Sequence, residues 1–313
     1  MTGAIARLFD NLGGLDGRLL RDEPMARHTS WKAGGPAAIF FRPATIDGLT
    51  AALELAGEAG IPWLVVGAGS NLLVRDGGFP GLVACTRALD RLSWQDEDRV
   101  RAECGVALPK LARDSADRGL AGIESLVGIP GTLGAAVVIN AGASGQEIGQ
   151  TVRRARIWSR QGGSRWRERT ELDFAYRRSS LTDREVVLEV ELALRKRDPD
   201  RLLQAMTAAL TARRKSQTVE GPNAGSVFRN PEGHRAWELI DRAGLRGCRI
   251  GGAMVSRVHC NFIVNLGGAT ATEIEQLIDL VSERVERQCG IRLLPEVKIV
   301  GRHKEDKPGE DRT

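Results

Sequence analysis

The sequence predicts a protein of mixed α and β structure with two or three domains. A chain of 313 residues is long for a single hydrophobic core. Residues 151–195 have the pattern of antiparallel strands, with a hairpin turn at Gly162-Gly163. Beyond Asp198-Pro199, a plausible domain boundary, helical and strand patterns alternate, which is typical of a compact α/β domain.

Composition narrows the class of ligand. The chain is 42% hydrophobic and 27% charged, as in soluble globular proteins. Its net charge of +5 indicates either a solvated basic surface or an anionic partner. The charges form no long basic block and aromatic residues are only 4%, which argues against stacking on nucleic acid. If the basic charge serves a function, it is therefore expected to bind a small anionic ligand. No nucleic acid is expected as a partner.

The cysteines indicate neither a disulfide framework nor a metal site. They are five in number, scattered, and without CxxC spacing. This usage is typical of a reducing compartment. The first ten residues contain no long apolar segment, and no run approaches membrane-spanning length. We therefore expect a cytoplasmic protein with no bound metal and no membrane insertion.

The N-terminal third predicts a βαβ-like unit after a helical or irregular lead-in over residues 1–27. Ala38–Phe41 is a short apolar strand. Thr45 can cap a helix whose apolar side chains recur at helical spacing, namely Ile46, Leu49, Leu53 and Ala56. Trp63–Val66 then has the composition of a buried strand.

This strand leads directly into a first glycine-rich run, Gly67-Ala68-Gly69-Ser70-Asn71. Such a loop lets backbone N–H groups approach a phosphate. The run is not a Rossmann fingerprint, because the third glycine is missing and Leu72–Val74 has a strand pattern where that motif requires a helix. Nor is it a P-loop. A tight strand–strand turn explains the run as well as a phosphate site does.

A second glycine-rich run follows two predicted strands, Leu82–Ala84 and Val100–Cys104, and a predicted helix over Leu108–Arg118. The run extends from Gly122 to Gly145. Close helix–strand packing explains such small residues, and so does an extended ligand lying on bare backbone. Two runs of this kind favour a large phosphate-bearing cofactor.

The C-terminal half carries further elements and candidate residues. Helical spacing of Leu203, Met206, Leu210 and Arg213 predicts one helix, and Thr272-x-x-Glu275 has the pattern of a capping box opening another, which stops before Gly290. The final predicted strand, Leu293–Val300, contains Glu296, for which strand alternation does not decide between an exposed and an inward position. The charged residues from Arg302 onward are expected to be disordered.

Two stretches contain groups suited to catalysis. Arg177, which follows the only tyrosine, Tyr176, is either solvated or directed at a carboxylate or enolate. Ser226 lies on a small-residue turn flanked by cationic residues, without a Gly-x-Ser-x-Gly elbow. It is therefore no triad nucleophile. It either satisfies its own loop backbone or acts as a general acid toward a carbanion.

Taken together, these motifs resemble the UDP-N-acetylenolpyruvoylglucosamine reductase (UDP-N-acetylmuramate dehydrogenase) family, in its shorter branch, which lacks an added tyrosine loop. The resemblance covers about His28 to Gly301, and it rests on the order and spacing of the motifs. These are His28-Thr29-Ser30-Trp31-Lys32, Gly67–Asn71, Gly128–Gly134, Tyr176-Arg177, Gly225–Phe228, Ile250–Ala253, Asn261–Asn265 and Pro295–Lys298.

The resemblance implies an α+β protein with a two-subdomain FAD-binding fold of the vanillyl-alcohol-oxidase type and a C-terminal α/β substrate-binding domain. The expected divisions are 1–84 for the first FAD subdomain, completed by the C-terminal strand, 85–198 for the second, 199–301 for the substrate domain and 302–313 for the tail. The implied FAD contacts are Trp31, Gly67, Ala68, Gly69, Ser70, Asn71, Gly128, Pro130, Gly131, Thr132 and Gly134.

The resemblance also implies the reaction. NADPH reduces FAD, which passes a hydride to the enolpyruvyl ether of UDP-N-acetylglucosamine enolpyruvate. Ser226 protonates the resulting carbanion, and Arg177 and Glu296 stabilise it. Tyr176, Arg214 and Asn230 contact the sugar nucleotide. We expect a monomer.

Departures and alternatives accompany this interpretation. Met254 stands where many relatives carry a carboxylate, which puts one substrate contact in question. Val258 and Cys260 replace a lysine and an alanine, and these changes are expected to be tolerated. A flavin oxidase of the same fold is one alternative, although Gly67–Asp76 contains no His or Cys for a covalent flavin. A basic binding protein without chemistry is the other.

Overall fold

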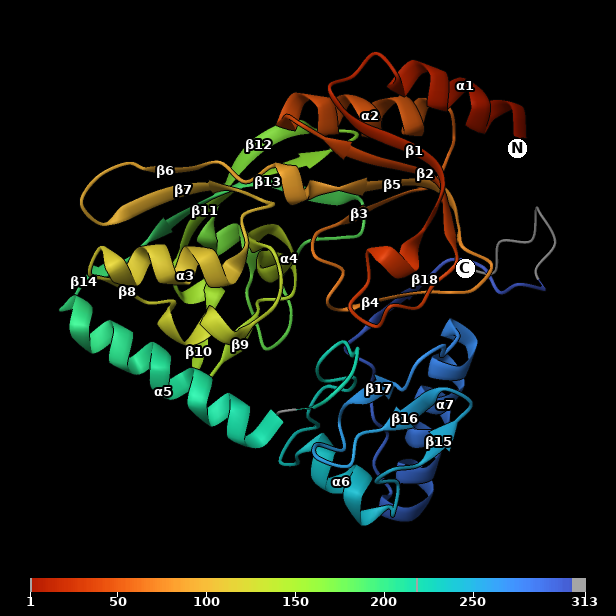
Figure 1. The fold of residues 1–313 in the computed structure, drawn as a ribbon. Helices are drawn as coiled ribbons and strands as arrows, with labels where there is room; N and C mark the ends of the chain where they lie inside the picture. The colour runs from red at the N-terminus through yellow and green to blue at the C-terminus, as the bar shows by residue number, and fades with distance from the viewer. Residues whose placement is uncertain (1, 218, 306–313) are drawn as a thin grey trace. The chain divides into compact units, whose positions relative to one another are not determined.

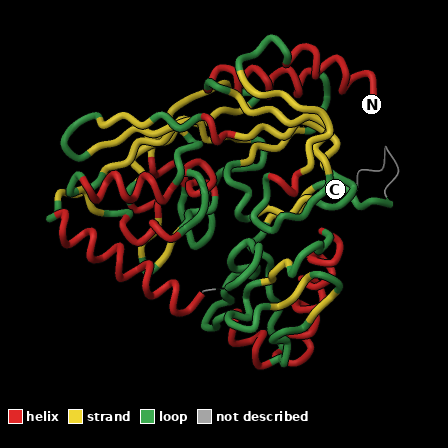
Figure 2. The backbone as a smooth tube through the Cα atoms, viewed as in Figure 1, coloured by secondary structure: helices red, strands yellow, loops and turns green. Residues whose placement is uncertain are grey.

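The computed structural model describes residues 2–217 and 219–305, with helices and strands throughout (Figures 1 and 2). The chain folds into two compact units, each with its own core. Unit 1 contains residues up to Leu20, Phe40–Ala68 and Val83–Lys215. Unit 2 contains Arg21–Ile39, Gly69–Leu82 and the residues from Ser216. The three-part division expected from the sequence remains a prediction.

The largest sheet of unit 1 is antiparallel and has five strands in the order β12-β11-β13-β7-β6. Its strands are β6 (Leu92–Trp94), β7 (Arg99–Glu103), β11 (Val152–Ser159), β12 (Gly163–Glu168) and β13 (Glu185–Ala193). Val186, Val187 and Leu188 are consecutive buried residues. Strand β13 therefore runs through the core, as a β-prone stretch without polar alternation predicts.

Short helices and strands complete this part of unit 1. The α-helices are α3 (Leu108–Asp117) and α4 (Leu133–Val138), and α4 packs on β7 and β13. The 3-10 helices are η2 (Thr86–Ala88), η3 (Glu124–Gly128), η4 (Ile148–Gln150) and η5 (Arg169–Leu172). The minor strands are β8 (Leu120–Ala121), β9 (Gly142–Ala143), β10 (Gln146–Glu147) and β14 (Arg195–Lys196). The predicted hairpin at Gly162-Gly163 is confirmed between β11 and β12.

A second sheet has the order β1-β2-β5-β3. Its strands are β1 (Gly17–Pro24), β2 (Pro36–Pro43), β3 (Trp63–Val66) and β5 (Phe79–Cys85). The accompanying helices are α1 (Thr2–Leu12) and α2 (Ile46–Glu58). The predicted cap of α2 is confirmed, because the Thr45 hydroxyl accepts a hydrogen bond from Gly48 N at 3.0 Å.

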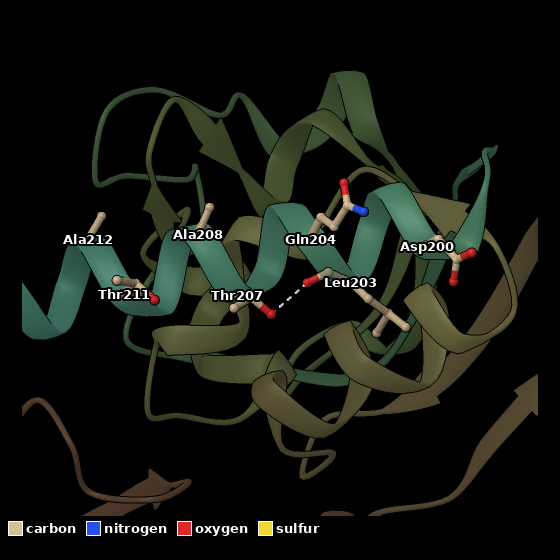
Figure 3. A pocket seen from close by; sticks show the side chains of 7 residues that line it. All are labelled: Asp200, Leu203, Gln204, Thr207, Ala208, Thr211 and Ala212. Atoms are coloured by element: carbon tan, nitrogen blue, oxygen red, sulfur yellow. Dashed lines mark hydrogen bonds between the residues drawn. The ribbon is translucent and has the colours of Figure 1, made fainter.

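Unit 1 ends at Lys215, within the last turn of the long helix α5 (Pro199–Gln217). Leu202 and Met206 are buried, whereas Leu203 is 40% exposed. A shallow groove of about 810 Å³ runs along the exposed side of this helix (Figure 3). It is lined by Asp200, Leu203, Gln204, Thr207, Ala208, Thr211 and Ala212. None of the site residues expected from the sequence lines this groove.

Unit 2 contains a three-stranded antiparallel sheet and two helices. The sheet has the order β15-β16-β17, from Arg249–Ile250, Ala253–Val255 and Ile263–Asn265. Helices α6 (Ala236–Arg242) and α7 (Ala271–Cys289) pack on one another, and α7 also packs on β15 and β16. A parallel pair joins β4 (Leu72–Val74) to β18 (Lys298–Val300), and η1 spans Met25–Arg27.

Two local predictions in unit 2 were wrong. Helix α7 is capped by Thr270 with Glu273, two residues before the predicted capping box. Thr272 and Glu275 instead bind Asp76 and Arg75 from a distant segment, so tertiary contacts use the side chains that the pattern assigned to the cap. The final strand is also shorter than predicted, since only Lys298–Val300 pairs as a strand. Helix α7 does end before Gly290, whose φ is +69°.

Two further observations concern membrane-spanning helices and metal-binding clusters among the described residues. No helix within 2–217 or 219–305 is long and apolar enough to cross a membrane. Over the same residues, no three His, Cys, Asp or Glu side chains gather in a way that could hold a metal ion.

Candidate active site

The first glycine-rich run is packed tightly against the second. Strand β3 leads into Gly67, where an added Cβ would lie 2.1 Å from the Thr132 hydroxyl oxygen. The Gly67 carbonyl also accepts a weak hydrogen bond from the Cys85 thiol at 3.8 Å. Gly67 and Thr132 both belong to unit 1, and Thr132 is buried. The structure therefore brings together two runs that lie more than sixty residues apart in the chain.

The last three residues of this run, Gly69 to Asn71, belong to unit 2. Gly69 has φ of +65°, and an added Cβ would lie 1.9 Å from the His28 carbonyl oxygen. Ser30 N donates to Gly69 O at 3.1 Å, and His28 Nε2 lies 2.9 Å from Glu23 Oε1. Only glycine fits at position 69, for reasons of both backbone conformation and space. The His28–Ser30 motif is thus the structural support of the loop.

Trp31 supports unit 2 from within. The side chain is fully buried, and its Nε1–H donates to Ile263 O at 2.8 Å. The backbone carbonyl of Trp31 accepts from Asn265 Nδ2 at 2.9 Å. The indole N–H is thus hydrogen-bonded inside the unit, and an FAD contact by Trp31 stays a prediction.

The second run is held by backbone hydrogen bonds to Cys104 and to Leu108, the first residue of α3. Leu108 N donates to Gly131 O, and Gly134 N donates to Cys104 O. An added Cβ at Gly134 would lie 2.7 Å from Cys104 Cβ. The Gly134 N–H is already hydrogen-bonded to Cys104. Its lack of a side chain is therefore what permits this close packing. Gly128, within the run, lies against the Arg213 side chain, whose Cδ would be 2.9 Å from an added Cβ.

Arg213 is a candidate that the sequence interpretation missed. Burial lowers the pKa of its guanidinium, which is a cation within reach of the second glycine-rich run. Arg214, the predicted substrate contact, is exposed in the last turn of the same helix. The sequence did contain an indication of this, because Arg213 follows Met206 and Leu210 at helical spacing along α5.

The Ser226 turn is built by its neighbours. Gly225 N donates to Asn223 Oδ1 at 3.0 Å, and Gly225 has φ of +74°. This Asx-type turn is what a short polar residue followed by glycine favours. Ser226 itself is half-buried. Asn230 is a predicted substrate contact. Its Oδ1 accepts a hydrogen bond from the N–H of Ala236, the first residue of α6.

Glu296 lies on the segment next to this turn. Glu296 N donates to Val227 O at 2.7 Å, and Phe228 pairs with Pro295 in an isolated β-bridge. Asn71 at the end of the first glycine-rich run donates to Glu296 O at 3.0 Å. Within unit 2 the structure therefore joins the Ser226 turn, the Glu296 segment and the end of the glycine-rich loop.

Arg177 lies in unit 1, on a tight turn closed by Ala175 and Arg178. Each of these two residues donates its N–H to the other's carbonyl, at 2.9 and 3.0 Å. Arg177 has φ of +53°, a conformation that favours glycine, and Tyr176 is 52% exposed. The Arg177 guanidinium donates to Gly142 O at 2.9 Å and lies over the Tyr176 ring. Such a strained, non-glycine residue is a frequent feature of functional turns.

The fold and the paired glycine-rich runs define a flavin-binding protein. Residues 37–166 match the family described as "FAD binding domain". Two glycine-rich runs meet where Gly67 packs on Thr132, and glycine-rich loops of this kind are what a diphosphate approaches, so the residues present fit this cofactor. The protein is an oxidoreductase that binds FAD.

The particular family is set by similarity over nearly the whole chain. Residues 217–300 match "UDP-N-acetylenolpyruvoylglucosamine reductase, C-terminal domain". Proteins named UDP-N-acetylenolpyruvoylglucosamine reductase are 47% identical in Geobacter metallireducens, over 92% of this chain and 95% of that protein, and 45% identical in Syntrophotalea carbinolica, over 89% and 93%. The chain belongs to this reductase family.

A solved structure agrees. The crystal structure of UDP-N-acetylenolpyruvylglucosamine reductase from Thermus caldophilus matches with a TM-score of 0.77 and 32% identity, covering 91% of this chain and 99% of that one. The family resemblance and the fold class predicted from the motifs are confirmed.

Proposed function

We propose that this protein reduces UDP-N-acetylglucosamine enolpyruvate to UDP-N-acetylmuramate with NADPH, a step of peptidoglycan precursor synthesis. FAD, when bound, would supply the hydride chemistry between NADPH and the enolpyruvyl ether. One observation carries the proposal. In a chain related to these reductases, the backbone of Glu296 is hydrogen-bonded to Val227, the residue after Ser226.

The proposed roles follow from where charge develops. Hydride addition to the methylene carbon moves the electron pair of the double bond onto the neighbouring carbon and its carboxylate. The Ser226 hydroxyl then gives its proton to that carbon, and the serine recovers a proton from solvent. A guanidinium at Arg177 stabilises the negative charge, and a protonated Glu296 donates a hydrogen bond to the enolate oxygen.

We assign Tyr176, Arg214 and Asn230 to the sugar nucleotide. A diphosphate and a carboxylate in one substrate match a basic protein with a net charge of +5. Tyr176 and Arg214 are exposed, and Asn230 is exposed at its turn, as contacts to a diffusible ligand require.

Separating the two half-reactions tests the proposal. Ser226→Ala should leave flavin reduction by NADPH unchanged. It should slow flavin reoxidation by the enolpyruvyl substrate by about 100-fold or more, the usual contribution of a general acid. Rapid mixing with detection of flavin absorbance measures both steps. Wild-type reoxidation by the variant would rule out Ser226 as the proton donor.

A flavin oxidase with covalent cofactor makes a different prediction. Burial, and secondarily the charge of Glu103, raise the pKa of the Cys104 thiol to about 12, so this cysteine beside Gly134 is not a nucleophilic thiolate. We expect acid denaturation to release all the FAD into the supernatant. Flavin retained on the precipitated chain would favour the oxidase, and protein that takes up no FAD would favour a binding protein.

A further inference from the structure

The side chain of Asn261 holds the segment after Ser226 as a strand neighbour would. Its Oδ1 accepts from Phe228 N at 2.9 Å, and its Nδ2 donates to Phe228 O at 2.8 Å. Asn261 is only 4% exposed, and its partner lies 33 residues away in the chain. One amide side chain thus satisfies both backbone groups of one residue, as in a hydrogen-bonded antiparallel pair.

The backbone of Asn261 extends this contact toward the serine. Val227 N donates to Asn261 O at 2.8 Å. On the other side, Val227 O accepts from Glu296 N at 2.7 Å, and Arg229 N donates to Leu294 O at 3.0 Å. The three residues after Ser226 therefore lie between Asn261 and the Glu296 segment. Asn261 therefore holds from one side the same residues that the Glu296 segment holds from the other.

Asn261 is itself placed by a compact loop. Ser256 Oγ accepts from both Val258 N and His259 N, at 3.1 and 3.2 Å. Ser256 N donates to Phe262 O at 2.8 Å, which closes the loop around Asn261. The asparagine therefore acts from a rigid base, as a group that positions another residue requires.

Asn265, a second buried asparagine of unit 2, makes hydrogen bonds to a different set of residues. Asn265 is equally buried, at 4% exposed, and makes three side-chain hydrogen bonds. Those bonds reach Trp31, Gly267 and Ala269. None of them reaches the Val227–Arg229 segment, whereas both side-chain bonds of Asn261 do.

We propose that Asn261 is a positioning residue for proton transfer, which fixes the Ser226 hydroxyl relative to Glu296 and the reacting carbon. This inference rests on the proposed role of Ser226. Asparagine is required because Phe228 presents one donor and one acceptor. Aspartate keeps the acceptor toward Phe228 N but loses the donor toward Phe228 O, and alanine loses both.

The test compares half-reactions in FAD-loaded Asn261→Ala and Asn261→Asp. For Asn261→Ala we expect flavin reduction by NADPH at the wild-type rate. Reoxidation at saturating enolpyruvyl substrate should be about 100-fold slower, the scale of a misplacement near 1 Å. The substrate concentration that gives half the maximal rate should change little, because binding contacts remain. Asn261→Asp, which conserves shape and one hydrogen bond, should fall between Asn261→Ala and the wild type.

Ser282→Ala is the matched control for lost stability. The Ser282 hydroxyl donates to Leu293 O at 3.0 Å in the same unit, a hydrogen bond that does not involve the serine turn. This variant should reoxidise at the wild-type rate. If it slows reoxidation as much as Asn261→Asp does, a general loosening of unit 2 explains the effect and the inference is overturned.

A double variant separates this inference from the proposed function. If Asn261 acts through Ser226, adding Asn261→Ala to Ser226→Ala should slow reoxidation by less than about 3-fold beyond Ser226→Ala alone. Full multiplication of the two effects would overturn the positioning role while leaving Ser226 as the donor. If instead Ser226→Ala alone is without effect, the proposed function of the serine fails.

Discussion

The turn that carries Arg177 in unit 1 and the turn that carries Ser226 in unit 2 are both tied down by a buried asparagine, but by different means. Asn140 donates to Ala175 O at 3.0 Å, while its other bonds go to Glu147 and Gly149. Asn261 places both side-chain bonds on Phe228. Asn140 reaches the Arg177 turn at one carbonyl, whereas the residues after Ser226 are hydrogen-bonded on both sides, to Asn261 and to the Glu296 segment.

The difference matches what each side chain must do. A guanidinium stabilises charge over a range of positions, so the Arg177 turn needs only a local closure between Ala175 and Arg178. A hydroxyl that transfers a proton must lie within hydrogen-bond reach of one atom. Backbone strain is found at Arg177, whose φ is +53°. Long-range hydrogen bonds are instead found at the residues after Ser226.

Removing the charge at the first turn should have the largest effect. We expect Arg177→Ala to slow flavin reoxidation by the enolpyruvyl substrate by about 100- to 1,000-fold, because a charge-stabilising donor is lost. Flavin reduction should be unaffected. Rapid-mixing absorbance measures both steps. Arg178→Ala, which removes a largely exposed neighbouring guanidinium, is the matched control and should stay near the wild-type rate.

Weakening the Asn140 contact to that turn should have a smaller effect. Asn140→Ala removes only one hydrogen bond to the turn, at Ala175 O, so we expect reoxidation to slow by about 10-fold, less than for Asn261→Ala. The same rapid-mixing assay applies. The control is Ser179→Ala, which loses a part-buried hydrogen bond to Val138 O in the same unit. Equal losses for Asn140→Ala and Asn261→Ala would remove the distinction between the two turns.

The smallest effect is expected on the stability of unit 2, through Asp76 and the first turn of α7. Burial opposes ionisation of Asp76, but hydrogen bonds from Thr272 and Ala271, with the charge of Lys304, lower the pKa of this carboxyl. A lowered folded-state pKa contributes stability that is present above the unfolded value near 4 and lost as pH falls through the folded value. Asp76→Asn should therefore reduce stability by about 1 kcal/mol near neutral pH.

Hydrogen exchange of α7 amides measures this contribution. The difference between Asp76→Asn and wild type should shrink as the pH is lowered, because the wild-type carboxyl becomes neutral. A difference that is constant with pH would show that charge is not what Asp76 provides to the first turn of α7. Amides of β13 in unit 1 serve as the internal reference, since they belong to the other core.

Local patterns accounted for much of the secondary structure. The cap at Thr45, the Gly162-Gly163 hairpin and the end of α7 before Gly290 each depend on residues within a few positions of one another. The capping box at Thr272 was wrong for the complementary reason. Asp76, almost two hundred residues earlier, takes up the Thr272 hydroxyl, and no local pattern reports such a partner.

By itself the sequence determined the family, the α+β class and the order of the candidate motifs, because these depend on residue types and spacing along the chain. Only the tertiary structure decided which of those motifs meet. It joined Gly67 to Thr132, brought Glu296 beside Val227, and revealed Asn261 and Arg213 as candidates. Hydrogen bonds between residues 33 or 69 positions apart are selected by the packing of a whole unit, which periodicity within one segment does not encode.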